Sequence, residues 1–315
     1  MPAIGKSKQT LLVLFFFVLV GCTIKNTPVE RPTNSTLEMH VIDVGQGDSI
    51  LFVENDNVML VDAGDLGKDD IVTEYLNNLG IEEIDVLVGT HPHSDHMGNF
   101  DVILENFAVS TMYVPDILDE DITSKWFLRF LNKVDEIDSQ SDSEYSIWQF
   151  PKDASGNFRN FDLGNMHIQM LAPENKKYSN ANNYSIAMKV SFGYTDIMLT
   201  GDAEELVEKE ILNGNFNLDC EIMKSGHHGS NTSNSRKFLE SVSPEYVVIS
   251  AGFSNKYEHP SPETMDLYED MEIEVYRTDE SGTIVMSTDG KNIYFNKPTG
   301  DYLSGIELEK QREEK

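Results

Sequence analysis

Apolar and polar positions alternate along much of the chain in the pattern of β-strands. In residues 37–44, LEMHVIDV, the apolar Leu37, Met39 and Val41 recur with a period of two. Turn residues in GQGD and NDN separate this segment from two further apolar stretches, SILFVE and VMLVDAG. Residues 84–90, IDVLVGT, are continuously apolar, which is typical of a buried strand. This part of the chain therefore predicts consecutive strands, with a helix at about residues 70–79.

The following part of the chain predicts an amphipathic helix and then further strands. KWFLRFLNKVDEI places apolar residues on one face and predicts an amphipathic helix, with Phe127, Phe130, Leu131, Val134 and Ile137 on that face. From Met166 onward strand patterns return, and AEELVEKEIL predicts a helix between two of them. We expect an α/β fold of two packed sheets with outer helices, in one domain over residues 37–298. Residues 299–315 show no apolar face and are predicted to be a charged, frayed tail.

The N-terminus has the features of an export signal. Lys6 and Lys8 precede an apolar run that ends in Gly21-Cys22 and is too short to be read first as a membrane span. LVGC resembles the lipobox of bacterial lipoproteins, in which the cysteine is acylated. We interpret residues 1–22 as a lipoprotein signal peptide and 23–36 as a flexible tether. The mature protein is then extracytoplasmic and held at the cell membrane by lipid on Cys22; an ordinary secretory signal or an uncleaved anchor is the alternative.

Composition limits the classes of partner. The 315 residues include 54 acidic and 24 basic side chains, a net charge of −30, and the 39% hydrophobic content is sufficient for a buried core. The sequence has no lysine–arginine cluster that could bind along a nucleic-acid backbone, so long duplex nucleic acid is not an expected partner. Cys220 lies in an apolar segment and is expected in the core. The role of the acidic residues 116–161 and the oligomeric state remain open.

Histidines gather where the predicted strands end. THPHSDHMGN follows one apolar strand, Asp202 follows another, and six of the eight histidines lie in such clusters: His91, His93, His96, His227, His228 and His259. Strand ends at one edge of a sheet system can bring distant residues to one site. Imidazole nitrogens and carboxylate oxygens suit zinc and similar divalent ions. The pattern therefore predicts a metal centre, in which the two oxygens of Asp202 could bridge two ions.

HPHSDH, followed by a glycine two residues later, resembles the HxHxDH motif of the metallo-β-lactamase superfamily. VIDVGQGDSILF, VDAG, NYS, LTGDA, HHGSNTS and YEHPSPE are similar to the subgroup related to the extracellular domain of the competence protein ComEC. The resemblance spans about residues 39–290 and implies an αββα sandwich with a metal site along one edge of the sheets. It implies two divalent ions, with Zn²⁺ expected and Mn²⁺ as the alternative. Their ligands would be His91 and His93 for the first ion, Asp95, His96 and His227 for the second, and Asp202 between them.

One position departs from the superfamily pattern. Many members place a further histidine between the first motif and the bridging aspartate, where this chain has Asn183 in NNYS. Asn183 is expected to be a weak ligand or a substrate contact, which leaves the first metal site looser. His228 and His259 are predicted to donate to a substrate oxyanion, with a structural hydrogen bond as the alternative. Three acidic residues either orient the histidines or are turn carboxylates: Asp43, Asp48 and Asp62.

The resemblance implies hydrolysis of a phosphodiester, by a phosphodiesterase or nuclease type of activity, and the net charge of −30 favours small phosphodiesters or single-stranded ends. Metal ions lower the pKa of bound water to about 7, so that hydroxide is available at neutral pH. Asp95 is expected to serve both as a ligand and as a proton acceptor. Two alternatives stay open. One is an ester hydrolase of the same fold, such as a phosphorylcholine esterase; the other is a non-catalytic surface binding protein that keeps the metal cage for structure, although the complete ligand set disfavours it.

The lipobox interpretation predicts the behaviour of a Cys22→Ala variant. Without the acceptor thiol the chain cannot be acylated, so the variant should lose lipid labelling and leave the membrane fraction. Fractionation of cells that express the parent or the variant measures this. A variant that stays as membrane-associated and as acylated as the parent would show the interpretation to be wrong.

Overall fold

The fold is described from a computed structural model that covers residues 35–117, 124–140, 146–174 and 177–314. The predicted signal peptide, Cys22 and almost all of the predicted tether lie outside these ranges. In the part of the chain that is described, no helix is both long enough and apolar enough to cross a membrane.

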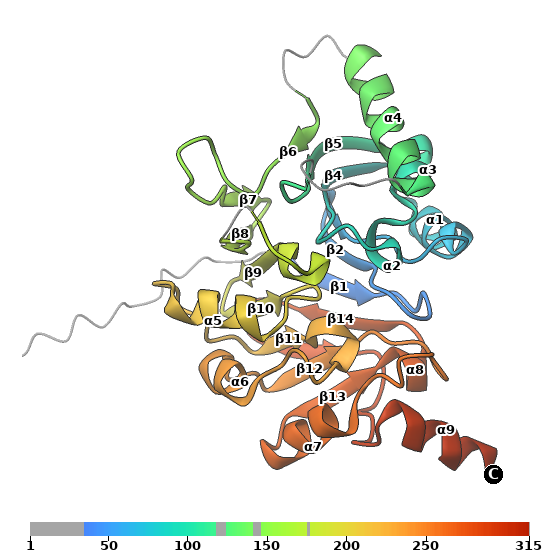
Figure 1. Ribbon diagram of the computed structural model, residues 1–315, viewed down its shortest axis with the longest axis vertical. Helices are drawn as coiled ribbons and strands as arrows, with labels where there is room; N and C mark the ends of the chain where they lie inside the picture. Colours follow the sequence, from blue (N-terminus) through green and yellow to red (C-terminus); the bar gives the residue numbers. More distant parts are fainter. Residues whose placement is uncertain (1–34, 118–123, 141–145, 175–176, 315) are drawn as a thin grey trace, which may run out of the picture. The chain divides into compact units, whose positions relative to one another are not determined.

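Within the described ranges the strands form two mixed sheets, one of eight strands and one of seven (Figure 1). The first contains, in spatial order, β15 (Ile293–Phe295), β14 (Ile284–Thr288), β1 (Leu37–Val41), β2 (Ile50–Glu54), β3 (Asn57–Val61), β4 (Glu83–Val88), β5 (Ala108–Tyr113) and β6 (Trp148–Gln149). The second contains β13 (Glu274–Arg277), β12 (Tyr246–Ile249), β11 (Ile222–Lys224), β10 (Thr195–Leu199), β9 (Ala187–Phe192), β8 (Met166–Ala172) and β7 (Phe161–Leu163).

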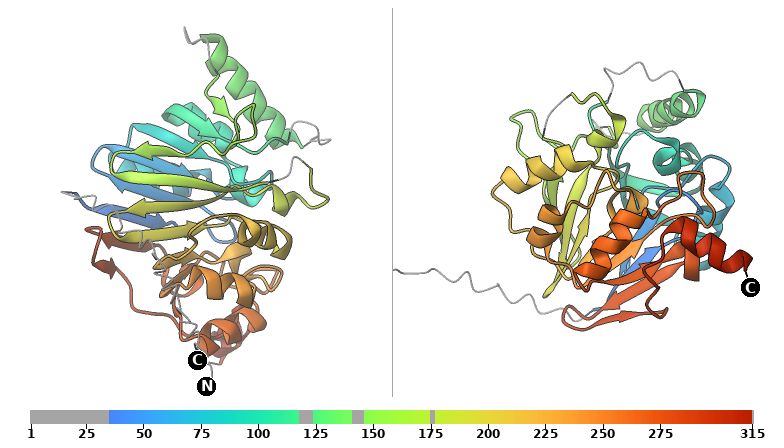
Figure 2. Two further views of the ribbon diagram at one scale, coloured as in Figure 1. Left: turned by 90° about the vertical axis from the view of Figure 1, so that its left-hand side faces the viewer. Right: turned by 60° about the horizontal axis from the view of Figure 1, so that its bottom comes forward.

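Helices cover the outer faces of both sheets. On the side of the first sheet lie α1 (Asp69–Asn78), α3 (Phe100–Asn106) and α4 (Lys125–Gln140), and on the side of the second lie α5 (Glu205–Asn213), α6 (Arg236–Val242) and α7 (Pro262–Asp270). Figure 2 (right) shows the green and cyan helices on one side of the strands and the yellow and orange helices on the other. These helices connect strands that pair in parallel, such as β3 to β4 and β10 to β11. The predicted αββα sandwich is confirmed.

The core between the sheets comes from the alternating positions. Leu37 and Met39 of β1 and Ile168 of β8 belong to one fully buried cluster that contains side chains from both sheets. Val61 of β3 and Leu199 of β10 are in the same cluster, close to the ends of their strands. Buried apolar area of this kind contributes about 25 cal/mol per Å². It fixes the two sheets against each other, and thereby the strand ends from which the site is built.

The C-terminal prediction was wrong. Residues 299–315 contain the helix α9 (Gly305–Glu313), which begins at a capping box formed by Ser304 and Glu307. Leu308 of this helix is 3% exposed. The buried Arg277 donates to the carbonyl oxygen of Leu303 just before the helix. The contact of Arg277 joins residues far apart in the sequence, so the local pattern of charges did not reveal it, whereas the capping box is a local signal that the prediction missed.

Replacing Leu308 by Ala tests whether α9 is part of the folded core. Loss of a buried leucine side chain should lower the free energy of unfolding by about 2 kcal/mol or more. Urea denaturation measures the change. Glu313→Ala, an exposed change in the same helix, is the matched control and should stay within about 0.5 kcal/mol. Equal stability of both variants would mean that the helix does not contribute to the core.

Candidate metal centre

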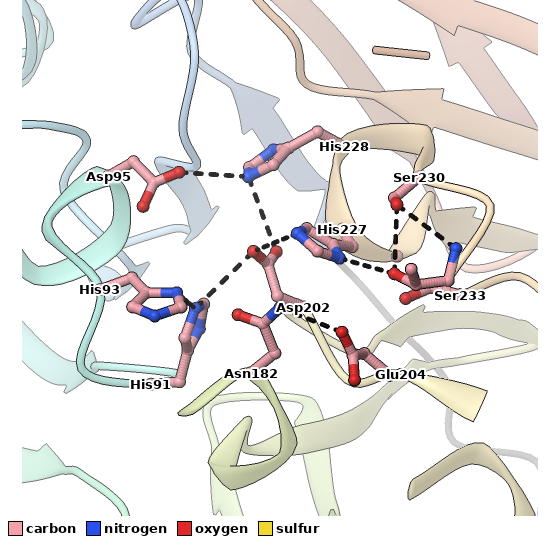
Figure 3. Close-up of polar contacts among 12 residues, drawn as sticks. His91, His93, Asp95, Asn182, Asp202, Glu204, His227, His228, Ser230 and Ser233 are labelled. Carbon is pink, nitrogen blue, oxygen red and sulfur yellow. Dashed lines mark hydrogen bonds and ion pairs between the residues drawn. The ribbon is translucent and has the colours of Figure 1, made fainter. Parts of the chain in front are cut away.

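Strands of both sheets end at the cluster of histidines and aspartates. β4 leads into HPHSDH and the short helix α2 (Ser94–Met97), β10 leads to Asp202, and β11 leads to the 3-10 turn η2 (Gly226–Gly229). Figure 3 shows Asp202 in the middle of the side chains that these segments supply. The structure brings together all the predicted ligands: His91, His93, Asp95, His96, Asp202 and His227.

The backbone of η2 is unusual. His227 and His228 both adopt left-handed conformations, with φ of 49° and 55°. Residues with a Cβ pay roughly 1–2 kcal/mol for this conformation. The conformation directs two consecutive rings toward Asp202. Such strain is maintained by surrounding contacts and is common at functional sites.

Asp202 is the centre of the cluster and is 2% exposed. Its Oδ2 lies 3.6 Å from Nε2 of His91, 3.3 Å from Nε2 of His96 and 3.5 Å from Nε2 of His227. Its Oδ1 lies 3.6 Å from Nε2 of His228. One carboxylate therefore faces four imidazoles through both of its oxygens.

Two adjoining groups have the composition of metal sites. In each, three residues offer ligand atoms that all lie within 4.8 Å of one another. The first group is His91, His93 and Asp202, and the second is Asp95, His96 and His228. Three buried atoms here have no hydrogen-bond partner in the described chain: Nε2 of His96, Nε2 of His228 and Oδ1 of Asp202. Unpaired buried polar atoms are costly, so these residues fit divalent ions that would complete their bonding.

The electrostatics of the cluster favour positive charge. Burial lowers the pKa of His96, but Asp202 and Asp62 outweigh it and raise that pKa well above its usual value. Burial also lowers the pKa of His228, but Asp202 and Asp48 outweigh burial and raise that pKa to about 10. Burial raises the pKa of Asp202, yet the neighbouring histidines hold it well below its usual range. The buried carboxylates thus create a negative potential that a bound cation would neutralise.

Two further carboxylates orient the histidines from behind. Oδ2 of Asp62 lies 2.7 Å from Nδ1 of His96, and Oδ1 of Asp62 accepts a hydrogen bond from the Thr90 amide at 2.8 Å. Nδ1 of His228 hydrogen-bonds to the carbonyl oxygen of Ser250 at 2.9 Å, and Oδ1 of Asp48 lies 3.3 Å from the same nitrogen. The buried Lys224 pairs with Oδ2 of Asp48 at 2.9 Å. With Nδ1 engaged in this way, each Nε2 is left to face the centre of the site.

Asp43 differs from these two residues. Its Oδ1 accepts a hydrogen bond from the amide of Gly45, two residues along the chain. From the sequence, each of three aspartates could either orient a histidine or support a turn. The structure places Asp48 and Asp62 against histidines, and Asp43 in a turn.

The positions of His227 and His228 differ from the prediction. His227 was expected in the second metal group and His228 at the substrate. Instead, Nε2 of His228 lies 3.6 Å from Asp95, and His228 completes the group with His96. His227 faces Asp202 from a partly exposed position, and its Nδ1 bonds to Thr232. His227 and His228 are neighbours of the same residue type, so the sequence alone could not assign them to different places. The backbone conformation of η2 assigns them.

Asn183 also requires a correction. It was expected at the first metal or at the substrate, but both ends of its amide bond to Glu204, at 3.2 Å and 3.1 Å. Asn182 lines the site cavity instead. The two residues lie in the 3-10 turn η1 (Ala181–Tyr184), where successive side chains point about 120° apart. His167 of β8 pairs with Asp162 at 2.6 Å and is in neither metal group.

A cavity of about 340 Å³ opens over the cluster. His259 lines it, as expected for a substrate contact. Four further residues at the site were not predicted from the sequence. Gln46, Asn182 and Tyr257 line the cavity, and Lys224 is buried and pairs with Asp48. Each lies next to or inside a stretch that carried the family resemblance, and that proximity was the available signal.

Comparison with known proteins gives a family match. A family model described as the Metallo-beta-lactamase superfamily matches residues 42–252. The ComE operon protein 3 of Bacillus subtilis (strain 168) is 28% identical over 267 residues, which cover 78% of this chain and 32% of that protein. The competence protein ComA of Neisseria gonorrhoeae is 27% identical over 272 residues, 85% of this chain and 34% of that protein. The chain thus spans about a third of the length of these relatives.

A solved structure shows the same fold at low identity. The metallo-beta-lactamase fold protein YhfI from Bacillus subtilis aligns with a TM-score of 0.51 and 12% identity. The alignment covers 80% of this chain and 100% of YhfI. The likeness extends to the arrangement of sheets and helices.

The contact between Asp48 and His228 predicts a loss of metal affinity in Asp48→Asn. Removing a carboxylate that orients a metal-binding histidine typically weakens metal binding about 10–100-fold. Titration of Zn²⁺ against a competing chelator measures the affinity. Asp43→Asn, in the same connection, is the matched control and should bind as the parent does.

Asp48→Asn also leaves Lys224 buried without its partner, which can destabilise the fold. The double variant Asp48→Asn/Lys224→Met removes both charges and separates the two effects. It should recover thermal stability while metal affinity stays low. Parental metal affinity in this folded double variant would contradict the role of Asp48.

Proposed function

The chain belongs to the metallo-beta-lactamase superfamily, and we propose that it is a metal-dependent hydrolase whose substrates are phosphodiesters. The resemblance predicted from HPHSDH is confirmed by the family match, and the competence-protein relatives confirm its ComEC-like branch. One observation carries the proposal: two metal-binding groups adjoin at the carboxylate of Asp202, beneath a single cavity. Paired cations of this kind suit displacement at phosphorus, where charge develops on the attacking and the leaving oxygen.

The chemistry of the donors suggests which residues hold the ions. His91, His93 and Asp202 would hold one, and Asp95, His96 and His228 the other. Bound divalent ions would supply Lewis acidity, activating water at neutral pH and neutralising charge on phosphoryl oxygens. Zn²⁺ is the ion we propose for this histidine-rich set, with Mn²⁺ as the alternative.

Asp95 is the residue that we propose as proton acceptor. It lines the cavity, and its side chain is 22% exposed. Burial raises the pKa of Asp95, but the nearby imidazoles of His228 and His96 outweigh burial and keep the carboxylate ionised. An ionised carboxylate beside the reacting groups can take up the proton that water releases. Asp62 and Asp48 meanwhile hold the rings of His96 and His228 in place.

The cavity lining favours short substrates. Among the described residues that line the cavity there is no lysine or arginine. With a net charge of −30, the protein surface would repel a long polyanion over a wide area. We therefore propose small phosphodiesters or single-stranded ends as substrates, and weak binding of long duplexes.

The proposed location rests on the N-terminal sequence. Residues 1–22 have the organisation of a lipoprotein signal, and Cys22 would carry the lipid. The enzyme would then act outside the cytoplasm at the membrane surface, on substrates that reach it from solution.

A substrate panel tests the proposed reaction. Protein reconstituted with Zn²⁺ or Mn²⁺ should hydrolyse bis(4-nitrophenyl) phosphate faster than 4-nitrophenyl phosphate or a β-lactam. Asp95→Asn should lower the rate by about 10²–10⁴-fold, because the variant loses a ligand and the proton acceptor. Asp43→Asn is the matched control and should keep the parental rate.

Two outcomes would change the assignment. Faster hydrolysis of 4-nitrophenyl phosphorylcholine than of every other diester would favour the phosphorylcholine-esterase alternative. No hydrolysis with either metal would favour the binding-protein alternative.

With single-stranded DNA as substrate, moderate salt should leave the rate unchanged or raise it, whereas a steep fall would indicate a basic groove.

A further inference from the structure

Several polar atoms of the cavity have no role in the metal groups. Nε2 of Gln46, Oδ1 of Asn182 and Nδ1 of His259 are buried and have no hydrogen-bond partner in the described chain. All three residues line the same cavity as Asp95 and Asp202. A buried polar atom without a partner costs about 1–3 kcal/mol, so these atoms are suited to a ligand that fills the cavity.

The connection that carries this lining is held in one conformation. Asn255 donates to the carbonyl oxygens of Gly252 and His259 at 2.8 Å and 2.6 Å. Its Oδ1 accepts from the amides of Tyr257 and His259, both at 3.1 Å. A single side chain therefore closes residues 252–259 into a loop and sets the position of Tyr257 beside the cavity.

The loop packs against the connection between β1 and β2. The amide of Gly252 donates to Oε1 of Gln46 at 3.3 Å. A Cβ at Gly252 would lie 2.7 Å from the backbone nitrogen of Gln46, so only glycine permits this approach. With Oε1 occupied, the Gln46 side chain has its amide donor left for a ligand.

Tyr257 supplies a planar surface at the rim of the cavity. Its side chain is 51% exposed, although the loop fixes its backbone. The ring lies nearly parallel to that of His259, with centroids 5.8 Å apart and planes at 20°. Nζ of Lys256 lies 4.7 Å from the centroid of the Tyr257 ring and is fully exposed.

We propose that Gln46 and Tyr257 form a subsite for the group next to the scissile phosphate. Gln46 donates to a phosphate oxygen, and Tyr257 stacks on a planar ring attached through the adjacent sugar. This inference rests on the proposed function and narrows it to nucleotide phosphodiesters. Aromatic side chains stack on any base, so the subsite would select nucleotides without selecting a sequence.

The surroundings of Tyr257 disfavour a choline group. Quaternary ammonium ligands are bound by cages of several aromatic rings. Tyr257 is the one tyrosine, phenylalanine or tryptophan among the described lining residues. The ammonium of Lys256 over the same ring would repel a second cation but attract an anionic ligand.

Binding of ligands that the enzyme does not consume tests the subsite. Titration calorimetry of the Zn²⁺-loaded protein should show thymidine 5′-monophosphate binding about tenfold tighter than methyl phosphate. Tyr257→Leu should remove this preference and leave the affinity for methyl phosphate unchanged, whereas Tyr257→Phe should retain it. Tyr294→Leu, a change of an exposed tyrosine on β15, is the matched control.

A second variant examines the donor. Gln46→Glu keeps an oxygen for the amide of Gly252 and replaces the donor by negative charge, so both phosphates should bind at least about tenfold more weakly. Unchanged affinity for both would refute the role of Gln46.

The outcomes separate this inference from the proposed function. An undiminished thymidine preference in Tyr257→Leu, in a protein that hydrolyses phosphodiesters, would overturn the subsite and leave the function. Loss of that preference in a protein that hydrolyses none would support the subsite and overturn the function. Preferential binding of phosphocholine that Tyr257→Leu removes would overturn the nucleotide assignment.

Discussion

The buried carboxylate of Asp202 is the constraint on which the site depends. An ionised carboxylate in the interior is costly unless opposite charge and hydrogen bonds compensate for it. The backbone amide of Asp202 donates a hydrogen bond to Oγ of Ser185, and the carboxylate of Asp202 faces four imidazoles. Those imidazoles come from β4 in one sheet and β11 in the other. In this fold the packing of the two sheets brings these strand ends to one point.

The two histidines of the second metal group, His96 and His228, are supported by different means. Behind His228, the carboxylate of Asp48 is paired with the buried Lys224, so a permanent cation balances its charge. Behind His96, Asp62 relies on hydrogen bonds from the amide and hydroxyl of Thr90. Burial accordingly raises the pKa of Asp62, whereas Lys224 and His228 outweigh burial and lower that of Asp48. His96 and His228 thus each direct Nε2 toward the same metal group, but from unequal electrostatic surroundings.

Local patterns predicted most of the fold and most of the residues that the structure brings together around Asp202. Leu37 and Met39 alternate in sequence because they face a core, and the HPHSDH spacing is itself the local geometry of the site. The failures concern information that is not local. Whether His227 or His228 lies beside Asp95 depends on left-handed backbone angles in η2. Whether Asn182 or Asn183 lines the cavity depends on the 3-10 turn η1, in which Oδ1 of Asn183 accepts from the amide of Glu204. The C-terminal helix depends in the same way on Arg277, which lies far from it in sequence.

An acidic protein that acts on anions must confine its positive potential to a small volume. The metal-binding groups do so, because cations held by buried residues act at short range, while charges on the surface are screened over about 8 Å at physiological salt. Contacts beyond the ions would then have to come from neutral groups, as the amide of Gln46 and the ring of Tyr257 are placed to provide. Neutral donors and a stacking surface recognise a ligand without attracting polyanions from a distance. Under the proposed function, recognition would then be limited to the few atoms around the scissile bond, and the charge of the whole protein would disfavour longer polymers.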